Sequence, residues 1–179
     1  MRPFSAFVLI LLFVTACQTE KAGFRNRPLR SSAEMTTITS DTNYLRIRPR
    51  AGRKLLLIDK QKQRQVASLD TLWGYETKAG TRYRYVKKTY YKMEEISPLT
   101  IYSNTYDIQT ANGSVSQTDH YFSRNPDSEL IALSKRNLRR TFQNDPALLE
   151  KLAGRRWRLY DRKAKRYVLN QVYEEVHRM

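Results

Sequence analysis

The sequence predicts an α+β protein in which a small antiparallel β-sheet or partly closed barrel is followed by two or three C-terminal α-helices. Two observations support this class. Short apolar and aromatic stretches with a period of two, separated by turn residues, occupy positions 38–123. Apolar residues at a spacing of four, preceded by capping residues, occupy positions 134–178. We therefore expect a single domain over 38–179, β-rich to 123 and helical from 134 to 178.

A β-hairpin is predicted in the stretch "TLWGYETKAGTRYRYV", residues 71–86. Its turn is centred on Lys78-Ala79-Gly80, and a pair of aromatic residues spaced by two lies on each side: Trp73 and Tyr75, then Tyr83 and Tyr85. Residues two apart share one face of a strand, so the four rings are expected to pair across the hairpin. Gly74 offers no side chain to the other face, which indicates a close backbone approach.

Further strands are expected where short apolar runs lie between charges or turn residues. They are the segments 43–49, 53–60, 90–96, 99–106 and 111–123. The last one opens with Asn112-Gly113, a pair favoured in two-residue hairpin turns. The order of these strands in the sheet is left open.

The helical part carries two start signals and one long apolar stripe. Ser134 is placed to cap one helix, and Asp145 with Pro146 opens a second one that should stop at Gly154. A final helix is expected to pack on the core through a stripe of residues: Val168, Leu169, Val172, Tyr173 and Val176.

The N-terminus has the three parts of a secretory signal peptide over residues 1–16. Arg2 precedes an apolar run over residues 6–14, and two small residues follow it. The run is shorter than the roughly 20 apolar residues that a membrane span needs. The quartet Val14-Thr15-Ala16-Cys17 resembles the lipobox of bacterial lipoprotein precursors. The alternative is a plain signal peptide, or a short buried segment, in which Cys17 is incidental.

The lipobox resemblance implies that the thiol of Cys17 receives a diacylglycerol and that the peptide bond before it is cut. An anchoring role explains a lone cysteine, so no disulfide, metal site or cofactor is expected. Gln18 stands where an Asp usually retains such proteins in the inner membrane, so we expect an exported protein anchored to the outer membrane. Residues 17–37 would be the lipidated N-terminus and a flexible tether, because they are polar and show no period.

Two segments, "LWGYETKAGTRYRYV" and "LSKRNLRRTFQNDPALLEKL", are similar to segments of small uncharacterised exported lipoproteins of Gram-negative bacteria. In those proteins a Trp-Gly-Tyr strand leads through a Gly turn to a Tyr-Arg strand, and a helix precedes a second one opened by Asn/Asp-Pro. The matching positions are Trp73, Gly74, Tyr75, Gly80, Tyr83, Arg84, Lys135, Asn137, Leu138 and Phe142. The resemblance implies the same layout and brings no catalytic residues.

The chain is strongly basic, with a formal net charge of +16 and a pI near 10.1. Such a charge usually indicates a nucleic-acid partner. An exported protein instead meets the polyanions that are abundant outside the cytoplasm. We therefore expect anionic lipid, lipopolysaccharide or acidic glycan as the partner, and no nucleic acid. The alternative is a solvated basic surface that only keeps the protein soluble.

Basic residues are densest in "GRRWRLYDRKAKR", residues 154–166. The candidate residues for an anionic partner are Arg155, Arg156, Arg158, Lys163, Lys165 and Arg166. Trp157 and Tyr160 among them could stack on sugars or lie at a headgroup interface. Alternatively the two rings cover the core, with the aliphatic stems of the arginines over them.

The sequence contains few candidate catalytic residues. His120 and His177 are far apart, and neither belongs to a metal-binding or nucleophile motif. Asp119-His120 and Glu94-Glu95 are adjacent pairs, whose members point to opposite faces of a strand. We therefore expect a non-enzymatic binding or scaffold module of the cell envelope. The alternative is a small envelope hydrolase with dispersed carboxylates, which would need a pocket with two inward carboxylates of raised pKa.

Replacing the thiol tests the anchor. Cys17→Ser should yield an uncleaved or soluble protein, because a hydroxyl at this position is not a substrate for diacylglycerol transfer. Incorporation of labelled fatty acid, together with membrane fractionation, measures the change. A variant that is still acylated and still in the membrane fraction would contradict the lipobox interpretation.

Overall fold

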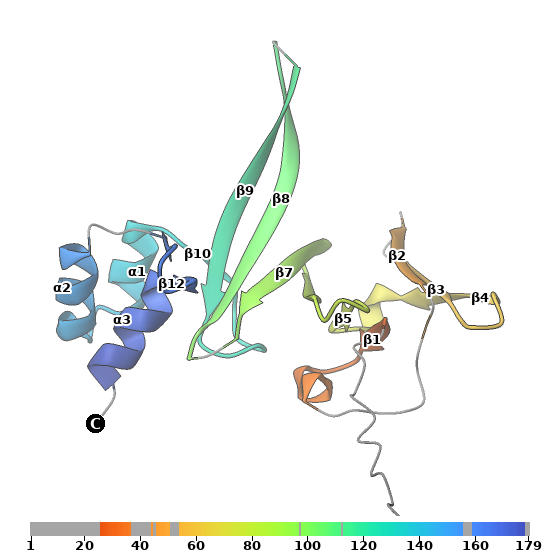
Figure 1. Ribbon diagram of the computed structural model, residues 1–179, viewed down its shortest axis with the longest axis horizontal. Coiled ribbons are helices and arrows are strands. Elements are labelled where there is room, and N and C mark those ends of the chain that lie inside the picture. The colour runs from red at the N-terminus through yellow and green to blue at the C-terminus, as the bar shows by residue number, and fades with distance from the viewer. Residues whose placement is uncertain are drawn as a thin grey trace, which may run out of the picture.

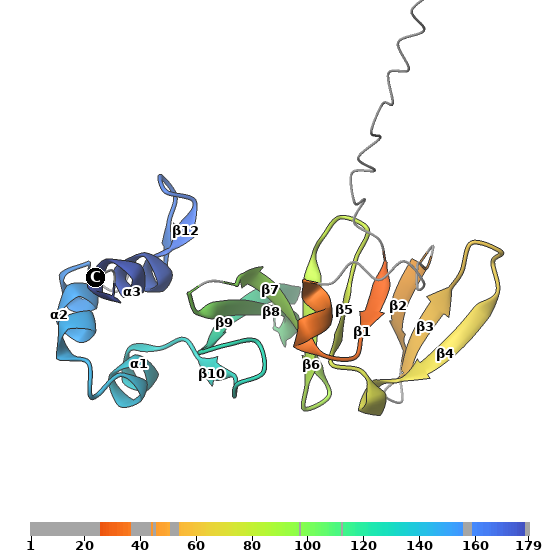
Figure 2. The ribbon, with the colours of Figure 1, turned by 90° about the horizontal axis from the view of Figure 1, so that it is seen from below.

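The computed structural model describes residues 26–36, 44, 46–50, 54–96, 98–111, 113–155 and 159–177 (Figure 1). Within them the chain forms a curled antiparallel sheet of seven strands, a separate three-stranded sheet, a short β-ribbon and three α-helices. The fold is thus α+β, as predicted, although it is mostly β. The helices and the three-stranded sheet lie at opposite ends of the molecule (Figure 2).

Every neighbouring pair in the seven-stranded sheet is antiparallel. In spatial order the strands are β1 (Arg27–Leu29), β5 (Gly74–Glu76), β6 (Arg82–Val86), β7 (Thr89–Glu95), β8 (Thr100–Thr110), β9 (Gly113–Ser123) and β10 (Ile131–Ala132). The three-stranded sheet contains β2 (Arg46–Arg50), β3 (Lys54–Ile58) and β4 (Arg64–Ser68), and the ribbon β11 (Tyr160–Asp161) and β12 (Arg166–Tyr167). Two short 3-10 helices are η1 (Ser32–Met35) and η2 (Leu69–Thr71).

The prediction of a flexible tether over 17–37 is wrong for its second half. Strand β1 pairs with β5, and Leu29 is fully buried. Met35 in η1 is also buried against the same core cluster. A three-residue strand has no readable period, so only its pairing with β5 reveals it. Residues 1–25, including Cys17 and the predicted signal peptide, lie outside the described residues.

Two other elements depart from the sequence prediction. Strand β4 was not expected, because its sequence "RQVAS" has little apolar character; it forms by pairing with β3 in register, Val66 opposite Leu56. The C-terminal part is not wholly helical either, since the β11–β12 ribbon interrupts it. Both elements are defined by their partner strands more than by their own sequences.

The predicted hairpin is confirmed as β5 and β6, but one of the four aromatic rings, that of Trp73, packs in a different core cluster from the other three. Tyr75 lies opposite Tyr83 and their rings stack with centroids 4.8 Å apart. Trp73 instead precedes β5 and packs in a second cluster, where the Arg84 guanidinium lies 5.7 Å from its ring centroid. The predicted pairing of all four rings is therefore wrong for Trp73.

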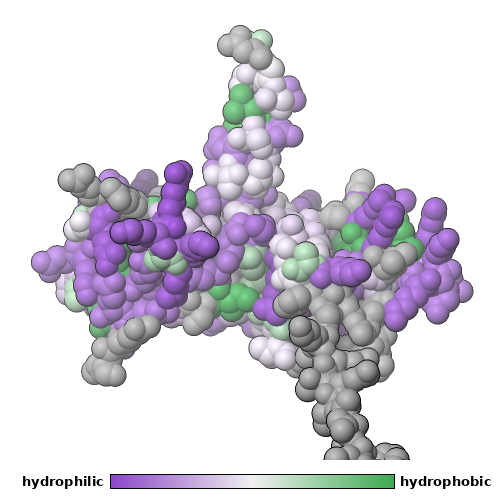
Figure 3. Space-filling model, viewed as in Figure 1, coloured by the Kyte–Doolittle hydropathy of each residue, from purple (hydrophilic) through white to green (hydrophobic). Residues whose placement is uncertain are grey.

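Strands β8 and β9 extend beyond the rest of the sheet as a projecting arm, residues 104–119 (Figure 1). They pair from Thr100 opposite Ser123 to Thr110 opposite Gly113, whereas β7 pairs with β8 only up to Ser103. The sequence has no Lys or Arg between Lys92 and Arg124. The arm is mostly pale in Figure 3, whereas purple prevails at the two ends of the body. The arm is consequently the part of this basic protein that carries no cation.

The three α-helices begin and end largely as the capping residues predict. They are α1 (Lys135–Thr141), α2 (Pro146–Gly154) and α3 (Val168–His177). The Ser134 hydroxyl accepts a hydrogen bond from Asn137 N at 3.2 Å, and Asp145 Oδ1 accepts one from Leu148 N at 3.1 Å. The apolar stripe of α3 is confirmed as a packing face against the largest core cluster.

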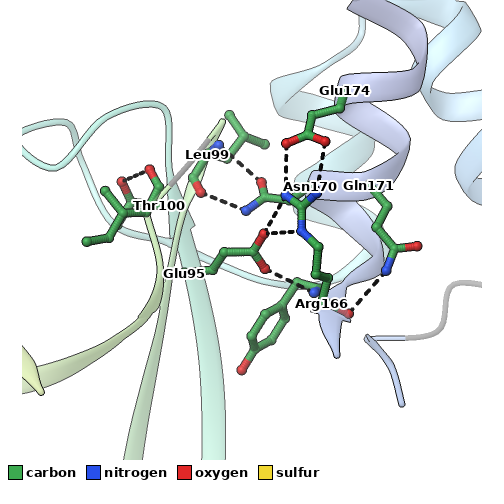
Figure 4. A network of polar contacts seen from close by, with 9 residues as sticks. Glu95, Leu99, Thr100, Arg166, Asn170, Gln171 and Glu174 are labelled. Carbon is green, nitrogen blue, oxygen red and sulfur yellow. Dashed lines mark hydrogen bonds and ion pairs between the residues drawn. The ribbon is translucent and has the colours of Figure 1, made fainter. Parts of the chain in front are cut away.

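Helix α3 is joined to the sheet by polar contacts that Figure 4 draws. The side chain of Asn170, fully buried, accepts a hydrogen bond from Leu99 N at 3.1 Å and donates one to Leu99 O at 2.9 Å. Glu95 Oε2 accepts a further bond from Tyr167 N at 3.0 Å. Because a buried backbone group without a partner is costly, these bonds hold the connection between β7 and β8 against α3.

A methyl group added at Gly74 tests the close approach in the hairpin. An ideal Cβ there would lie 2.0 Å from the carbonyl oxygen of Tyr83, so the two strands would have to separate. Gly74→Ala should lower the free energy of unfolding by about 1–3 kcal/mol, the usual cost of overpacking. Gly154→Ala is the matched control, because no atom lies within 4 Å of its Cβ. Urea denaturation of both variants makes the comparison, and equal stabilities would contradict this account.

Candidate functional site

Arg166, one of the six predicted anion-binding residues, is bound within the chain. Its Nη2 atom lies 2.8 Å from Glu95 Oε1 and 2.8 Å from Glu174 Oε1. The hydrogen bonds that Arg166 donates to Glu174 and Glu95 raise the pKa of Arg166 well above its usual range. The guanidinium therefore joins strand β7 to helix α3, and two carboxylates neutralise its charge.

The other five candidates divide into three kinds. Arg155 pairs with Glu175 at 2.7 Å. Lys163 and Lys165 are exposed in the turn between β11 and β12. Arg156 and Arg158, with Trp157 between them, lie outside the described residues. The structure thus does not gather the described members of this segment into one free cationic cluster.

A shallow cleft of about 710 Å³ lies beside this turn. Its lining residues are Gly154, Arg155, Tyr160, Asp161, Arg162, Lys163 and Val168. Asp161 accepts hydrogen bonds from the backbone N–H groups of Ala164 and Lys163, and these bonds lower its pKa. A permanent carboxylate in the cleft weakens its attraction for an anion.

Tyr160 only partly covers the core, the role that the alternative interpretation of this segment gives it. Its ring lies against that of Tyr167 with centroids 5.2 Å apart in an edge-to-face arrangement. The side chain is nevertheless 43% exposed. Tyr160 therefore packs with one edge and presents the remainder to solvent.

The three-stranded sheet presents the clearest cationic surface, which we call the basic face. Its nine residues form three rows across β2, β3 and β4: Arg46, Ile58 and Arg64; Arg48, Leu56 and Val66; Arg50, Lys54 and Ser68. Residues of the opposite face, such as Leu55 and Leu57, lie in the core. The basic face thus combines five cations with the exposed Val66 and the half-buried Ile58, around a buried Leu56.

The cations of the basic face are exposed and make no ion pair with another described residue. None of the nine residues is acidic. By contrast, Arg27 and Arg82 on the neighbouring sheet both pair with the buried Glu76, at 2.7 and 3.5 Å. Five like charges without counter-charges produce a positive potential over the face, which favours an anionic partner.

The sequence contained a signal for the basic face that our prediction did not use. Arginines alternate with other residues in "RIRPR", residues 46–50, and a strand places alternate residues on one face. Residues 46–68 contain eight Lys or Arg and a single acid, Asp59. The contributions of Lys54 and Arg64 depend on the register of three strands, and that register is not visible in any one segment.

The carboxylates that a hydrolase would require are bound to cations or hydroxyl groups. Glu94 accepts hydrogen bonds from Ser103 Oγ at 2.6 Å and from Lys92 Nζ at 2.9 Å. Glu95 binds Arg166, so Glu94 and Glu95 both have partners. Hydrogen bonds lower the pKa of two further carboxyl groups, Asp119 and Asp161.

His120 lies beside a small cavity between the base of the arm and the helices. The cavity measures about 280 Å³, and leucines form much of its wall: Leu133, Leu138, Leu152, Leu159 and Leu169. Burial lowers the pKa of His120, so the imidazole is neutral at pH 7. Asp119 instead accepts hydrogen bonds from Tyr106 and Gln117. The two residues therefore do not form an acid–base pair.

Neither a metal-binding cluster nor a membrane-spanning helix occurs among the described residues. They contain no group of three or more His, Cys, Asp or Glu side chains placed to hold a metal ion. No α-helix among them has the length and apolar character needed to cross a membrane. Comparisons with known proteins identify no matching family model, no matching curated protein and no matching solved structure.

The structural role of Arg166 can be separated from a binding role. Arg166→Gln should lower the free energy of unfolding by about 1–2 kcal/mol, because it leaves Glu95 and Glu174 without their cation. Lys165→Gln, one residue away and exposed, should change it by less than about 0.5 kcal/mol. Urea denaturation measures both. Equal, small effects would indicate that the guanidinium does not hold helix α3 to the sheet.

Proposed function

We propose that this chain is a non-enzymatic binding or scaffold module of the bacterial cell envelope. The lipid on Cys17 anchors it to the outer membrane, and its basic face binds an anionic component of the envelope. The observation that supports binding most directly is the group of five cations on β2, β3 and β4, which lack ion pairs with described residues.

Anionic lipid, lipopolysaccharide and acidic glycan are the ligands considered. Each Lys or Arg near an anionic surface contributes roughly 1 kcal/mol, so five cations suffice for measurable binding. A shallow, solvent-exposed face suits a large polyanion better than a small molecule, which usually occupies an enclosed pocket. Nucleic acid is not expected because the protein would be exported.

The alternative of an envelope hydrolase has two carboxylates in one cavity, since Glu94 and Glu95 both line a cavity of about 490 Å³, but neither is free of a basic partner. Such an enzyme would use two carboxyl groups in a pocket, at least one of raised pKa. Glu94, Glu95 and Glu174 are engaged with basic side chains instead. We therefore retain the binding function as the proposal.

Charge reversal on the basic face tests the function. In a lipid-free chain starting at Gln18, Arg46→Glu, Arg48→Glu and Lys54→Glu combined should abolish binding to vesicles containing phosphatidylglycerol, to lipopolysaccharide and to acidic polysaccharide. Wild-type binding should weaken with salt, because the screening length falls from about 8 Å at physiological ionic strength to about 3 Å at 1 M. Co-sedimentation, or surface-immobilised ligand, measures the binding.

The matched control reverses three cations of the C-terminal turn: Arg162→Glu, Lys163→Glu and Lys165→Glu. Both triple variants should keep a thermal midpoint close to that of the wild type, because exposed charges contribute little to folding. Loss of binding in the first variant alone supports the basic face. Loss in the control alone would contradict it and favour the C-terminal segment, and unchanged binding in both would contradict the proposed function.

A further inference from the structure

We infer that the basic face lies against the headgroup layer of the same membrane that holds the Cys17 lipid, with lipid phosphates between its cations and with Val66 and Ile58 at the acyl boundary. This inference rests on the proposed function and specifies the ligand of the same surface. Its three supports are the composition of the face, the short sequence distance from Cys17 to the first described residue beside it, and the distribution of charge over the molecule.

The composition of the face suits a lipid surface. Ile58 and Leu56 lie two residues apart on β3, and Val66 lies opposite Leu56 on β4. Leu56 is buried and Ile58 half-buried, so Val66 and Ile58 are the aliphatic residues that the face presents. Each of the three rows also contains at least one Lys or Arg. Val66 is 53% exposed, the second highest value among the exposed large hydrophobic residues of the described chain. Interfacial protein surfaces combine an apolar strip with Lys and Arg in this way.

The face also lacks the groups that would favour other polyanions. None of its nine residues is aromatic, so it offers no ring for stacking on sugars or nucleobases. Aliphatic side chains gain nothing from a soluble glycan, whereas they are stabilised when they enter the acyl boundary. Arginine is well suited to phosphate, because its guanidinium presents several donors in a planar fork.

The first described residue lies next to this face. Tyr44 N donates a hydrogen bond to Asn26 O at 2.9 Å, and Tyr44 is two residues from the first cation of the face, Arg46. Asn26 follows Cys17 by nine residues in the sequence. Fully extended, they span about 30 Å, and as a random coil about 15–18 Å. A lipid on Cys17 would thus keep the basic face within reach of the bilayer at a high effective concentration.

Charge distribution gives the orientation. The arm carries Asp107 and Asp119 and no Lys or Arg, and it belongs to the sheet that the three-stranded sheet packs against. Figure 3 shows purple residues around a green patch at the end formed by β2, β3 and β4, whereas the arm is largely pale. An anionic membrane would therefore attract the basic face and leave the arm in the aqueous phase.

Two single-thiol variants of the full, lipidated protein test the orientation. Cys17 is the chain's one cysteine, and acylation would consume its thiol, so Val66→Cys introduces the only free thiol for an environment-sensitive fluorophore. Val115→Cys on the arm is the matched control, since the two valines are 53% and 57% exposed. Each labelled protein is reconstituted in vesicles of phosphatidylethanolamine and phosphatidylglycerol, with or without lipids spin-labelled near the headgroup.

We expect a blue shift of emission and strong quenching by the spin-labelled lipids at position 66, and neither change at position 115. Both effects at position 66 should be lost in neutral phosphatidylcholine vesicles, or when Arg46→Glu and Lys54→Glu are added. They should persist when soluble polyphosphate or acidic polysaccharide is supplied at moderate concentration, because the anchored bilayer is the local ligand.

Other results would overturn the inference in distinguishable ways. If the fluorophore at position 66 stays in water while the charge-reversed protein loses polyanion binding, the proposed function stands and membrane contact is wrong. If a soluble polysaccharide displaces the face from the vesicle, the glycan is the preferred ligand and the inference is again wrong. Equal quenching at positions 66 and 115 would contradict the proposed orientation.

Discussion

The side-chain amide of Asn170 is the contact on which the relative positions of sheet and helices depend. It satisfies both backbone groups of Leu99 while fully buried, at the point where β7 passes into β8. An apolar residue there would leave a buried donor and acceptor unpaired, at a cost of about 1–3 kcal/mol each. Arg166, four residues earlier, adds the link to Glu95. Helix α3 can therefore dock in one orientation, which places its apolar stripe on Ile101 and Phe122.

The strongly basic composition of the chain is distributed unevenly over the fold. Some cations have structural partners: Arg84 donates to Ser128 O at 2.7 Å and Asp127 O at 3.1 Å, which fixes the loop after β9. Others, on the basic face, have no described counter-charge. The arm contains no Lys or Arg at all. Net charge alone therefore says little about a binding surface, because paired cations add to the total without attracting a partner.

Features whose cause lies within a few residues could be predicted from the sequence. Ser134 and Asp145 cap their helices, and Gly74 marks the close strand approach, because each effect acts on neighbouring backbone groups. Features that depend on pairing between distant segments could not be predicted in this way. Strand β1 falls within the predicted tether, since three residues become a strand only by pairing with β5. The six C-terminal residues were grouped as one site because they are close in sequence, although Arg155 and Arg166 have acidic partners elsewhere in the chain.

The sequence by itself determined the α+β class, the helix caps, the tight hairpin, the lipobox-like quartet ending at Cys17 and the overall positive charge. These follow from local periodicity, local hydrogen bonding and composition, which need no knowledge of the fold. Only the tertiary structure decided which cations are available to a partner. Arg46, Lys54 and Arg64 come together because three strands align in a particular register. That register depends on which face of the sheet is buried, and burial is a property of the whole chain.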